Sequence, residues 1–413
     1  MTVTSTTARA IVTKLLGRVK GGRIRLVDAH GEAWFGTLGT DVVSVHINDP
    51  RVYTRVLREG STGLGESYAD GWWDTDDLAR FLGLLHRAVA STYARRDRVH
   101  RLLRLLVDPI AHLRRPDKQR DAGNIAAHYD LGNDFFAQFL DETMMYSCAV
   151  FESPSATLAD ASIAKLDRLA SLLALGPDDR VLEIGTGWGG FAVHAAARYG
   201  CRVTTTTLSQ SQYEFTRRRI ADAGLGERVT VLADDYRDLS GTYDKVVAIE
   251  MIEAVDWREY DGFFAHCRRL LRNDGVLALQ AIVIPDESFD RVKRSTDFIK
   301  HAIFPGGCLP SVAALTAAAR RRGFSLAHED RIGLHYAETL RRWRRRLDDA
   351  RDEMIALGYD ERLVRLFEFY FAYCEAGFAA KYLDDAQLLY TAPAWRPDAL
   401  DVTRHASPLV RVP

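Results

Sequence analysis

The sequence lacks the features that mark secreted, metal-binding and membrane-spanning proteins. Its 413 residues include five cysteines, and no two of them form a Cys-x-x-Cys pair, so neither a disulfide framework nor a zinc site is expected. No apolar stretch reaches about 18 residues, the length that spans a bilayer, and the first residues lack the apolar core of a signal peptide. A reducing cytoplasm fits these absences, and we expect a cytoplasmic protein with no bound metal.

An excess of one charge is also missing, because 55 Lys and Arg residues stand against 56 Asp and Glu residues. We therefore expect no nucleic-acid partner. The basic residues are unevenly placed, with one block within residues 95–120 and another within residues 341–346. Such blocks are usually solvated faces; the alternative here is attraction to an anionic membrane surface.

Composition and length are those of a globular protein with more than one domain. Hydrophobic residues make up 47% of the chain and charged residues 27%. Residues 23–48 alternate like strands, residues 77–106 read as an amphipathic helix, and the polar, proline-bearing stretch 114–123 is typical of a linker. We expect one domain over residues 1–120 and a second over residues 121–413.

Residues 180–191, Arg-Val-Leu-Glu-Ile-Gly-Thr-Gly-Trp-Gly-Gly-Phe, run from an apolar strand into glycines that open a helix. Gly185 and Gly187 permit positive φ and a close approach of the backbone to a ligand, and the helix start aims free N–H groups at it. Dinucleotide-binding turns share this spacing. Glu183, however, resembles the strand-end acid of class I methyltransferases, which orients S-adenosylmethionine. The second expected strand ends at Leu208 without the acid that a nicotinamide-binding fold prefers.

Strand and helix signals alternate after residue 180. This alternation predicts a parallel sheet with helices on both faces and a ligand at the carboxyl ends of the strands. The fold class is α/β: a class I methyltransferase, Rossmann-like sheet with a smaller N-terminal α+β domain and helical C-terminal additions over residues 338–382. The expected strands are 180–184, 202–207, 228–233, 245–250 and 276–284, and the expected helices are 189–199, 211–223 and 258–272.

Motifs outside the glycine turn indicate a family. They are Ile-Ala-Ala-His-Tyr-Asp-Leu-Gly-Asn-Asp-Phe-Phe at 125–136, Tyr-Ser-Cys at 146–148 and Ile-Phe-Pro-Gly-Gly-Cys-Leu-Pro-Ser at 303–311. With the glycine turn, and in this order, they closely resemble the cyclopropane-fatty-acyl-phospholipid synthase family over about residues 60–380. The resemblance implies methyl transfer from S-adenosylmethionine to the double bond of an unsaturated phospholipid acyl chain, with a small N-terminal domain that helps to engage lipid.

The resemblance also assigns the residues that surround the two expected small molecules. In cyclopropane synthases a bicarbonate ion serves as the base that removes a proton from the methylated chain. Cys148, Glu253 and Tyr336 match three of the side chains that hold this ion, and Ile282 matches its backbone contact. The positions expected around S-adenosylmethionine are Tyr146, Ser147, Glu183, Gly185, Gly187, Thr207, Leu208, Gln212, Asp235 and Tyr236.

Three positions depart from the synthase pattern. Gln280 stands where bicarbonate is held by histidine, Ala254 replaces the histidine usual after Glu253, and Glu142 stands where proline is common. Each has a plainer interpretation: the Gln280 amide can bond the same anion, Ala254 is a packing variant, and Glu142 is a solvated acid. Taken together, they favour an internal carboxylate. Because Glu142 lies six residues before Cys148, we expect its carboxylate to occupy the space of bicarbonate and to act as the base.

These departures favour a branch that resembles the methyltransferases making 10-methyl-branched fatty acids, as does the pattern Glu-Met-Ile-Glu-Ala-Val at 250–255. In that branch the product is a 10-methylene chain that a separate flavin-dependent reductase saturates. A cyclopropane synthase and a catalytically silent lipid-binding relative remain as alternatives. The expected substrate is an unsaturated phospholipid at the inner membrane surface, approached by a peripheral protein, and a homo-oligomer is expected.

Overall fold

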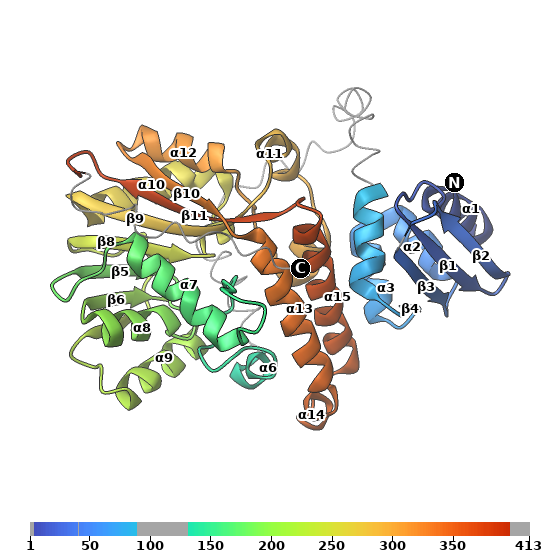
Figure 1. The fold of residues 1–413 in the computed structure, drawn as a ribbon, viewed down its shortest axis with the longest axis horizontal. Coiled ribbons are helices and arrows are strands. Elements are labelled where there is room, and N and C mark those ends of the chain that lie inside the picture. Colours follow the sequence, from blue (N-terminus) through green and yellow to red (C-terminus); the bar gives the residue numbers. More distant parts are fainter. Residues whose placement is uncertain (1–3, 40, 89–130, 397–413) are drawn as a thin grey trace. The chain divides into compact units, whose positions relative to one another are not determined.

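The computed structural model describes residues 4–39, 41–88 and 131–396, and their fold is drawn in Figure 1. The chain divides into two compact units. The first unit takes its described residues from 1–115, 294–305 and 340–382, and the second takes them from 116–293, 306–339 and 383–413. The chain therefore passes from one unit to the other several times, and each unit is described by itself below.

The first unit contains a four-stranded sheet in the order β2-β1-β3-β4. Strand β1 pairs parallel with β3 and antiparallel with β2, and β3 pairs antiparallel with β4. The strands expected within residues 23–48 are confirmed, whereas the helix that precedes them was not predicted. The elements are α1 (Ser5–Leu16), β1 (Gly22–Asp28), β2 (Gly31–Gly36), β3 (Asp41–Ile47), α2 (Arg51–Glu59), α3 (Ser61–Ala69), β4 (Trp73–Thr75), α13 (Gly333–Asp349) from residue 340, α14 (Arg351–Ala356) and α15 (Glu361–Ala379).

The C-terminal helices belong to this first unit and not, as expected, to the catalytic domain. Aromatic packing explains the difference, because the ring of Phe369 on α15 lies 4.8 Å from the ring of Phe298 and 5.9 Å from that of Tyr68 on α3. Polar contacts add to it, since Arg365 donates to the Asp74 carboxylate across 2.8 Å. The boundary expected at residue 120 lies outside the described residues, as do residues 89–106 of the helix expected over 77–106; residues 78–88 of it are helical.

The second unit contains a seven-stranded sheet in the order β10-β11-β9-β8-β5-β6-β7. Five strands, from β9 to β7, run parallel as expected. The elements are α6 (Asn133–Ala137), α7 (Leu158–Leu172), β5 (Arg180–Ile184), α8 (Gly190–Tyr199), β6 (Arg202–Thr206), α9 (Gln210–Asp222), β7 (Val229–Leu232), β8 (Tyr243–Ile249), α10 (Tyr260–Leu270), β9 (Leu271–Val283), α11 (Asp286–Val292), α12 (Val312–Arg321), β10 (Ser325–Arg331) and β11 (Asp384–Thr391).

Apolar side chains on both faces of this sheet explain why helices cover each side (Figure 1). Because side chains alternate along a strand, Val181 of β5 packs among the residues of α7, α8 and α9, whereas its neighbour Leu182 packs with α10 and α12. Both side chains are fully buried. Burial of each such residue contributes roughly 1.5–3 kcal/mol, so the two helical layers hold the carboxyl ends of the strands in fixed positions.

Strands β10 and β11 were not predicted, and they make the sheet mixed and not purely parallel. Strand β11 pairs antiparallel with β9 and with β10, and its register places Gln387 opposite Gln280 and Asp385 opposite Ile282. Alternation of residue types cannot reveal the direction of a strand, and β11 follows the helices of the first unit along the chain. The consequence for the site is direct, because β11 brings two polar side chains to strand β9.

Candidate active site

The glycine turn lies at the carboxyl end of β5, as predicted. Gly185 has a φ of +95° and Gly187 has a φ of +52°, backbone conformations that residues other than glycine rarely adopt. A Cβ atom on Gly187 would face open space, whereas one on Gly185 would meet the Met251 side chain at 3.1 Å. The turn therefore offers an uncovered stretch of backbone at the start of α8, where free N–H groups can face a ligand.

Glu183 is the penultimate residue of β5, beside this turn, and its side chain is buried. The Thr205 hydroxyl on β6 donates to its carboxylate across 2.7 Å. Burial raises the pKa of Glu183 to about 8, so the carboxyl group is mostly protonated at neutral pH. A ligand whose hydroxyl groups donate to this carboxylate would favour its ionised form. This set of groups fits the ribose of a nucleoside such as S-adenosylmethionine.

The other expected cofactor positions lie at the same edge of the sheet. Thr207 follows β6, and its hydroxyl donates to the Gln212 amide oxygen across 2.9 Å; Leu208 comes directly after it. Asp235 follows β7, and its carboxylate accepts from Arg237 at 2.6 Å. The Tyr236 ring packs 5.6 Å from the ring of Phe263 on α10. Because neighbouring parallel strands end at one edge, these side chains share the edge that carries Glu183.

The segment Tyr146–Cys148 is held by buried groups of α6 and α7. The Tyr146 ring lies 5.4 Å from that of Phe136. The Ser147 hydroxyl accepts from the ammonium group of Lys165 across 2.7 Å, and Lys165 is fully buried. Burial lowers the pKa of Lys165 to about 8. The segment is thus held by an aromatic contact with Phe136 and by a hydrogen bond from Lys165.

A buried polar centre forms around Glu250, the residue that follows β8. Its carboxylate accepts hydrogen bonds from the backbone N–H of Cys148 at 2.7 Å, from the side-chain amide of Gln280 at 2.8 Å and from the hydroxyl of Tyr336 at 2.6 Å. Cys148, Gln280 and Tyr336 are all buried. Burial raises the pKa of the Cys148 thiol well above its ordinary value, so the thiol is neutral. Three of the predicted catalytic residues therefore meet at one carboxylate.

The orientation of the Gln280 amide is fixed from β11. Arg168 on α7 can only donate, and its Nε donates to the Gln387 amide oxygen across 3.1 Å. Gln387 must then turn its NH₂ group to the amide oxygen of Gln280, at 3.0 Å. The NH₂ group of Gln280 is left to face the carboxylates of Glu250 and of Asp385, the latter at 3.0 Å.

Two further acids lie near this centre. The Glu253 carboxylate accepts the backbone N–H of Ile282 across 2.5 Å. This contact joins two residues that were expected to hold the same anion. Burial raises the pKa of Glu253 to about 8, with the nearby Glu250 as a second cause. Burial, followed by the charge of Glu250, also raises the pKa of Asp385 well above its ordinary value. One carboxyl oxygen of each of these two acids is buried without a hydrogen-bond partner among the described residues.

Glu142 does not lie in this centre, so the expectation that its carboxylate takes the place of bicarbonate is corrected by the structure. Its side chain is exposed. Its backbone oxygen accepts a hydrogen bond from the Arg219 side chain at 3.2 Å. The preceding residue, Asp141, is the buried acid of this segment, and its carboxylate accepts from Thr143 and Ser162. Although Glu142 is close to Cys148 in the sequence, its side chain does not lie in the core.

Sequence reasoning missed several residues of the centre. Glu250 was quoted only as part of a motif, yet it follows an apolar strand end, a position that commonly carries function in such sheets. Lys165 offered a weaker signal, as the one lysine on an otherwise apolar helix face. No signal marked the two polar residues of β11, because their neighbours depend on strand pairing. The missed residues are Lys165, Arg168, Glu250, Asp385 and Gln387.

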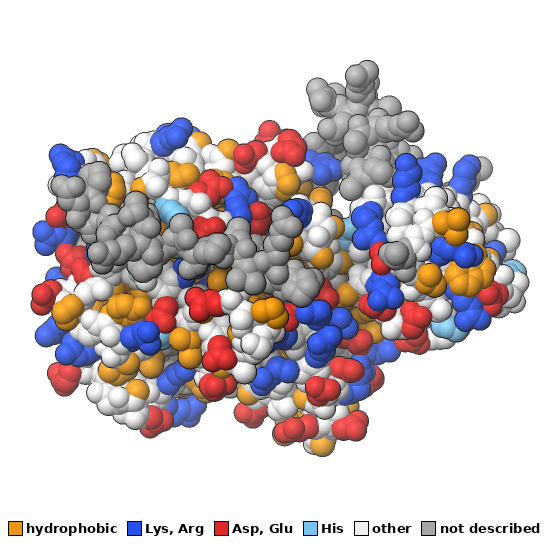
Figure 2. All heavy atoms as spheres, in the orientation of Figure 1, with side chains coloured by type: hydrophobic (Ala, Val, Ile, Leu, Met, Phe, Trp, Pro, Cys, Tyr) orange, Lys and Arg blue, Asp and Glu red, His pale blue; other side chains and the backbone are white. Residues whose placement is uncertain are grey.

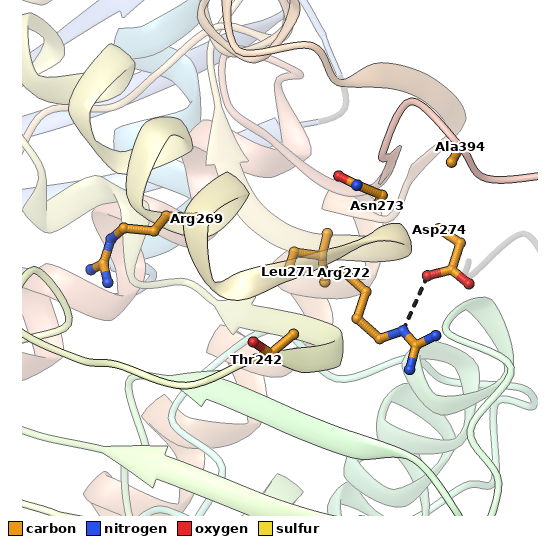
Figure 3. Close-up of a pocket in the computed structure, with 7 residues that line it drawn as sticks. All are labelled: Thr242, Arg269, Leu271, Arg272, Asn273, Asp274 and Ala394. Atoms are coloured by element: carbon orange, nitrogen blue, oxygen red, sulfur yellow. Dashed lines mark hydrogen bonds and ion pairs between the residues drawn. The ribbon is translucent and has the colours of Figure 1, made fainter.

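A hollow is present at the opposite edge of the sheet, where β9 begins (Figure 3). Its side chains pair with their neighbours: Arg272 donates to Asp274 across 3.2 Å, and Arg269 donates to the backbone oxygen of Leu239 across 2.9 Å. The hollow lies at the amino end of the parallel strands, whereas ligands of such sheets bind at the carboxyl ends. We therefore do not assign it to the active site.

The basic blocks do not form one uniform surface in the part of the chain that the structure describes. Residues 95–120 lie outside it. Within 341–346, Trp343 is buried, Arg344 pairs with Glu375 at 3.1 Å, and Arg345 and Arg346 are exposed. Figure 2 shows basic and acidic side chains intermingled on the face that includes α13. Among the described residues, no helix combines the length and apolar character needed to cross a bilayer.

The sheet order, the glycine turn with its strand-end acid and the polar centre beside it define a class I methyltransferase fold. Residues 116–388 match the family described as Mycolic acid cyclopropane synthetase. The chain belongs to this family, and the enzyme is an S-adenosylmethionine-dependent methyltransferase. The resemblance noted from the motifs is thereby confirmed.

Two relatives match almost the whole chain. The tuberculostearic acid methyltransferase UfaA1 of Mycobacterium tuberculosis is 41% identical over 389 residues, which cover 91% of this chain and 89% of the relative. The cyclopropane-fatty-acyl-phospholipid synthase of Escherichia coli is 35% identical over 355 residues, covering 86% of this chain and 89% of that protein. Similarity therefore extends through both units of the chain.

Solved structures match the methyltransferase part. The cyclopropane synthase MmaA2 from Mycobacterium tuberculosis aligns with a TM-score of 0.62 and 31% identity over 65% of this chain and 98% of its own. The mycolic acid cyclopropane synthase CmaA1, complexed with SAH and CTAB, aligns with a TM-score of 0.61 and 33% identity over the same shares. One neighbour thus binds the demethylated form of the cofactor that the glycine turn fits.

Proposed function

We propose that the protein transfers a methyl group from S-adenosylmethionine to the double bond of an unsaturated phospholipid acyl chain, and that the product is a 10-methylene chain, the precursor of a 10-methyl-branched chain. The observation that carries this proposal is the polar centre of Cys148, Glu250, Gln280 and Tyr336, with a carboxylate of the protein in its middle. The 41% identical methyltransferase named for tuberculostearic acid supports the branched product.

The cofactor would lie along the carboxyl edge of β5, β6 and β7. Bound S-adenosylmethionine would supply an electrophilic methyl group. Gly187 would leave room for it, Glu183 would accept hydrogen bonds from its hydroxyl groups, and Asp235 and Tyr236 would lie beside its base. The segment Tyr146–Cys148 would close over its reactive end, because Lys165 and Glu250 hold that segment against the edge of the sheet.

The protein's main contribution to methyl transfer is positioning and exclusion of water. An alkene is a weak nucleophile, so it must be held in line with the methyl group, and fixed geometry can supply most of the rate enhancement. Attack leaves a positive charge on the acyl chain. The Glu250 carboxylate, positioned by the Tyr336 hydroxyl that donates to it across 2.6 Å, would provide negative charge for that cation in a largely buried site, where such interactions are strongest.

Membrane contact is the second part of the proposal. The first unit exposes apolar side chains around its sheet, and Arg23 lies 4.3 Å from the ring centroid of Trp34. A tryptophan beside an arginine suits the boundary between lipid tails and anionic headgroups. We propose that the protein is cytoplasmic and peripheral, and that this face contacts the inner membrane surface. We also propose that a separate flavin-dependent reductase saturates the product. The exposed apolar residues are Ile11, Leu15, Trp34, Leu38 and Val42.

Lipid analysis in a suitable host tests the reaction. The chain would be expressed in cells that make oleoyl phospholipids and have no methyltransferase of this family, and the fatty acids would be derivatised and examined by mass spectrometry. A methylene or methyl branch at carbon 10 is expected. A cyclopropane chain would replace the branch assignment with the synthase alternative, and unchanged lipids combined with no cofactor binding in calorimetry would indicate a silent relative.

A further inference from the structure

Glu250 holds its carboxylate in a site built to receive an anion. One oxygen accepts two N–H donors, the Cys148 backbone at 2.7 Å and the Gln280 amide at 2.8 Å, and the other accepts the Tyr336 hydroxyl at 2.6 Å. Two N–H groups that meet at one oxygen, with a hydroxyl at the other, use the side chain of Glu250 as an acceptor on both oxygens. This is the arrangement that an anion site presents.

Two further acids and one lysine surround this side chain. Burial raises the pKa of Glu253 to about 8 and that of Asp385 well above its ordinary value, so burial disfavours a negative charge on either acid. The buried ammonium group of Lys165 lies close enough to interact with Glu250. Glu250 therefore has a cation nearby and two neighbouring acids whose burial favours their protonated forms.

The backbone of Glu250 is held in an uncommon conformation. Its φ is +49°, in the left-handed region that favours glycine. The backbone N–H of Glu250 donates to the backbone oxygen of Gln280 across 2.8 Å, and this hydrogen bond fixes the geometry at the end of β8. Strain of this kind persists where surrounding contacts over-determine it, commonly at functional sites. The half-buried side chain reaches the centre from the strand end next to the glycine turn.

We propose that the Glu250 carboxylate is the base that takes the proton from the methylated acyl chain, an inference that rests on the proposed function. In this step the C–H bond of the new methyl group breaks after hydride migration has moved the cation to the methylated carbon. Its electron pair becomes the second bond between the former methyl carbon and the methylated chain carbon, which gives the methylene group, and the proton passes to a Glu250 oxygen. The half-exposed side chain then returns the proton to solvent. No external bicarbonate is required.

This assignment transfers to Glu250 the role that sequence reasoning gave to Glu142. Two of the side chains that resemblance places around bicarbonate, those at positions 280 and 336, donate to Glu250, and the backbone N–H of Cys148 donates to it as well. The Ile282 N–H, expected to hold the same ion, is occupied by Glu253. An anion in that place would therefore have to compete with Glu250 and Glu253 for these donors.

Two substitutions at Glu250 test the proposal. Glu250→Gln keeps the size but not the basicity, and should lower turnover by at least about 100-fold, the smaller end of what a general base contributes, while S-adenosylmethionine affinity from calorimetry changes less than about threefold. Glu250→Gly suits the positive φ and empties the site. Sodium bicarbonate, compared with sodium chloride at equal ionic strength, should raise the melting temperature of Glu250→Gly by a few degrees, leave that of the wild type unchanged, and restore turnover in the variant.

Glu227→Gln is the matched control, because Glu227 is exposed in the turn before β7, at the opposite edge of the sheet, and should behave as wild type. The proposal is overturned if Glu250→Gln keeps full turnover, if bicarbonate stabilises wild type and Glu250→Gly alike, or if wild-type turnover requires bicarbonate. A wild-type enzyme that methylates no lipid would refute the proposed function instead, while the melting temperatures would still report whether Glu250 fills an anion site.

Discussion

Gln387 on β11 donates its amide N–H to the side-chain oxygen of Gln280 on β9 across 3.0 Å, and both side chains are buried. The two residues stand opposite each other in the antiparallel register of the strands. Since Gln280 in turn donates to Glu250, the outer strand decides which end of an amide faces the carboxylate in the centre.

Replacement of Gln387 by methionine should disturb the reaction more than the fold. The change removes the donor that fixes Gln280, so its amide can turn and present oxygen to the Glu250 carboxylate. A lost hydrogen bond to a charged group costs about 1.5–3 kcal/mol, which corresponds to a fall in kcat of roughly tenfold or more. Steady-state kinetics should show the loss in kcat and little change in the KM for S-adenosylmethionine. An unchanged kcat would mean that Gln280 is oriented without Gln387.

Cofactor binding should release a proton near neutral pH. Burial raises the pKa of Glu183 to about 8 in the protein without ligand, and hydroxyl donors from a bound ribose would favour the ionised form. The affinity for S-adenosylmethionine should therefore rise with pH and level off above about pH 8. Calorimetry in two buffers with different ionisation enthalpies measures the released proton directly. Glu183→Gln should abolish the release and weaken binding by about tenfold, whereas Glu227→Gln should do neither.

The buried acid Glu253 predicts a falling stability as pH rises. Its pKa in the folded protein, about 8, lies above the ordinary value of 4.5. Between these values the folded state keeps a proton that the unfolded chain has lost, so the free energy of unfolding decreases with pH by up to about 1.4 kcal/mol per pH unit from this group. Glu253→Gln should flatten the curve of urea-unfolding free energy against pH between about 5 and 8. Parallel curves for the two proteins would contradict the assigned cause.

Removal of the exposed apolar residues near β2 should weaken binding to membranes. Trp34 is 44% exposed and Leu38 is 87% exposed in the first unit. The double variant Trp34→Ser, Leu38→Ser should sediment less with vesicles of anionic phospholipid, and the wild-type protein should lose binding as salt is added. Leu357→Ser is the control, because Leu357 is 52% exposed at the end of α14, near the exposed acids Asp352 and Glu353. Equal sedimentation of all three proteins would refute the proposed lipid-facing surface.

Local sequence patterns were sufficient for the central part of the sheet. Alternating apolar strands and helices end in glycines or caps, and the predicted strand 180–184 coincides with β5. The structure also brings Cys148 and Tyr336, both assigned by family resemblance, to Glu250, while their roles in the reaction stay predictions. The strand and helix predictions succeeded because each depends on neighbours along the chain, where residue type and spacing carry the information.

Contacts between distant segments could not be read in the same way. Asp385 and Gln387 reach the centre only through the antiparallel pairing of β11 with β9, which leaves no mark on either segment alone. Glu142 follows Asp141 and Glu250 follows Ile249, but the side chain of Glu142 is exposed to solvent whereas that of Glu250 accepts three hydrogen bonds. Which acid is enclosed depends on the donors around it, and these come from three separate stretches of chain.

The late position of β11 sets the order in which a new chain can mature. Strand β9 is translated about a hundred residues before the Asp384–Thr391 strand that covers its outer edge, and the intervening helices α14 and α15 belong to the other unit. Until the ribosome has released residue 391, β9 presents an open row of backbone donors and acceptors, a surface prone to mistaken pairing. Nascent chains of this enzyme should accordingly depend on chaperones until β11 has been made, and loss of β11 should leave an inactive, aggregation-prone product.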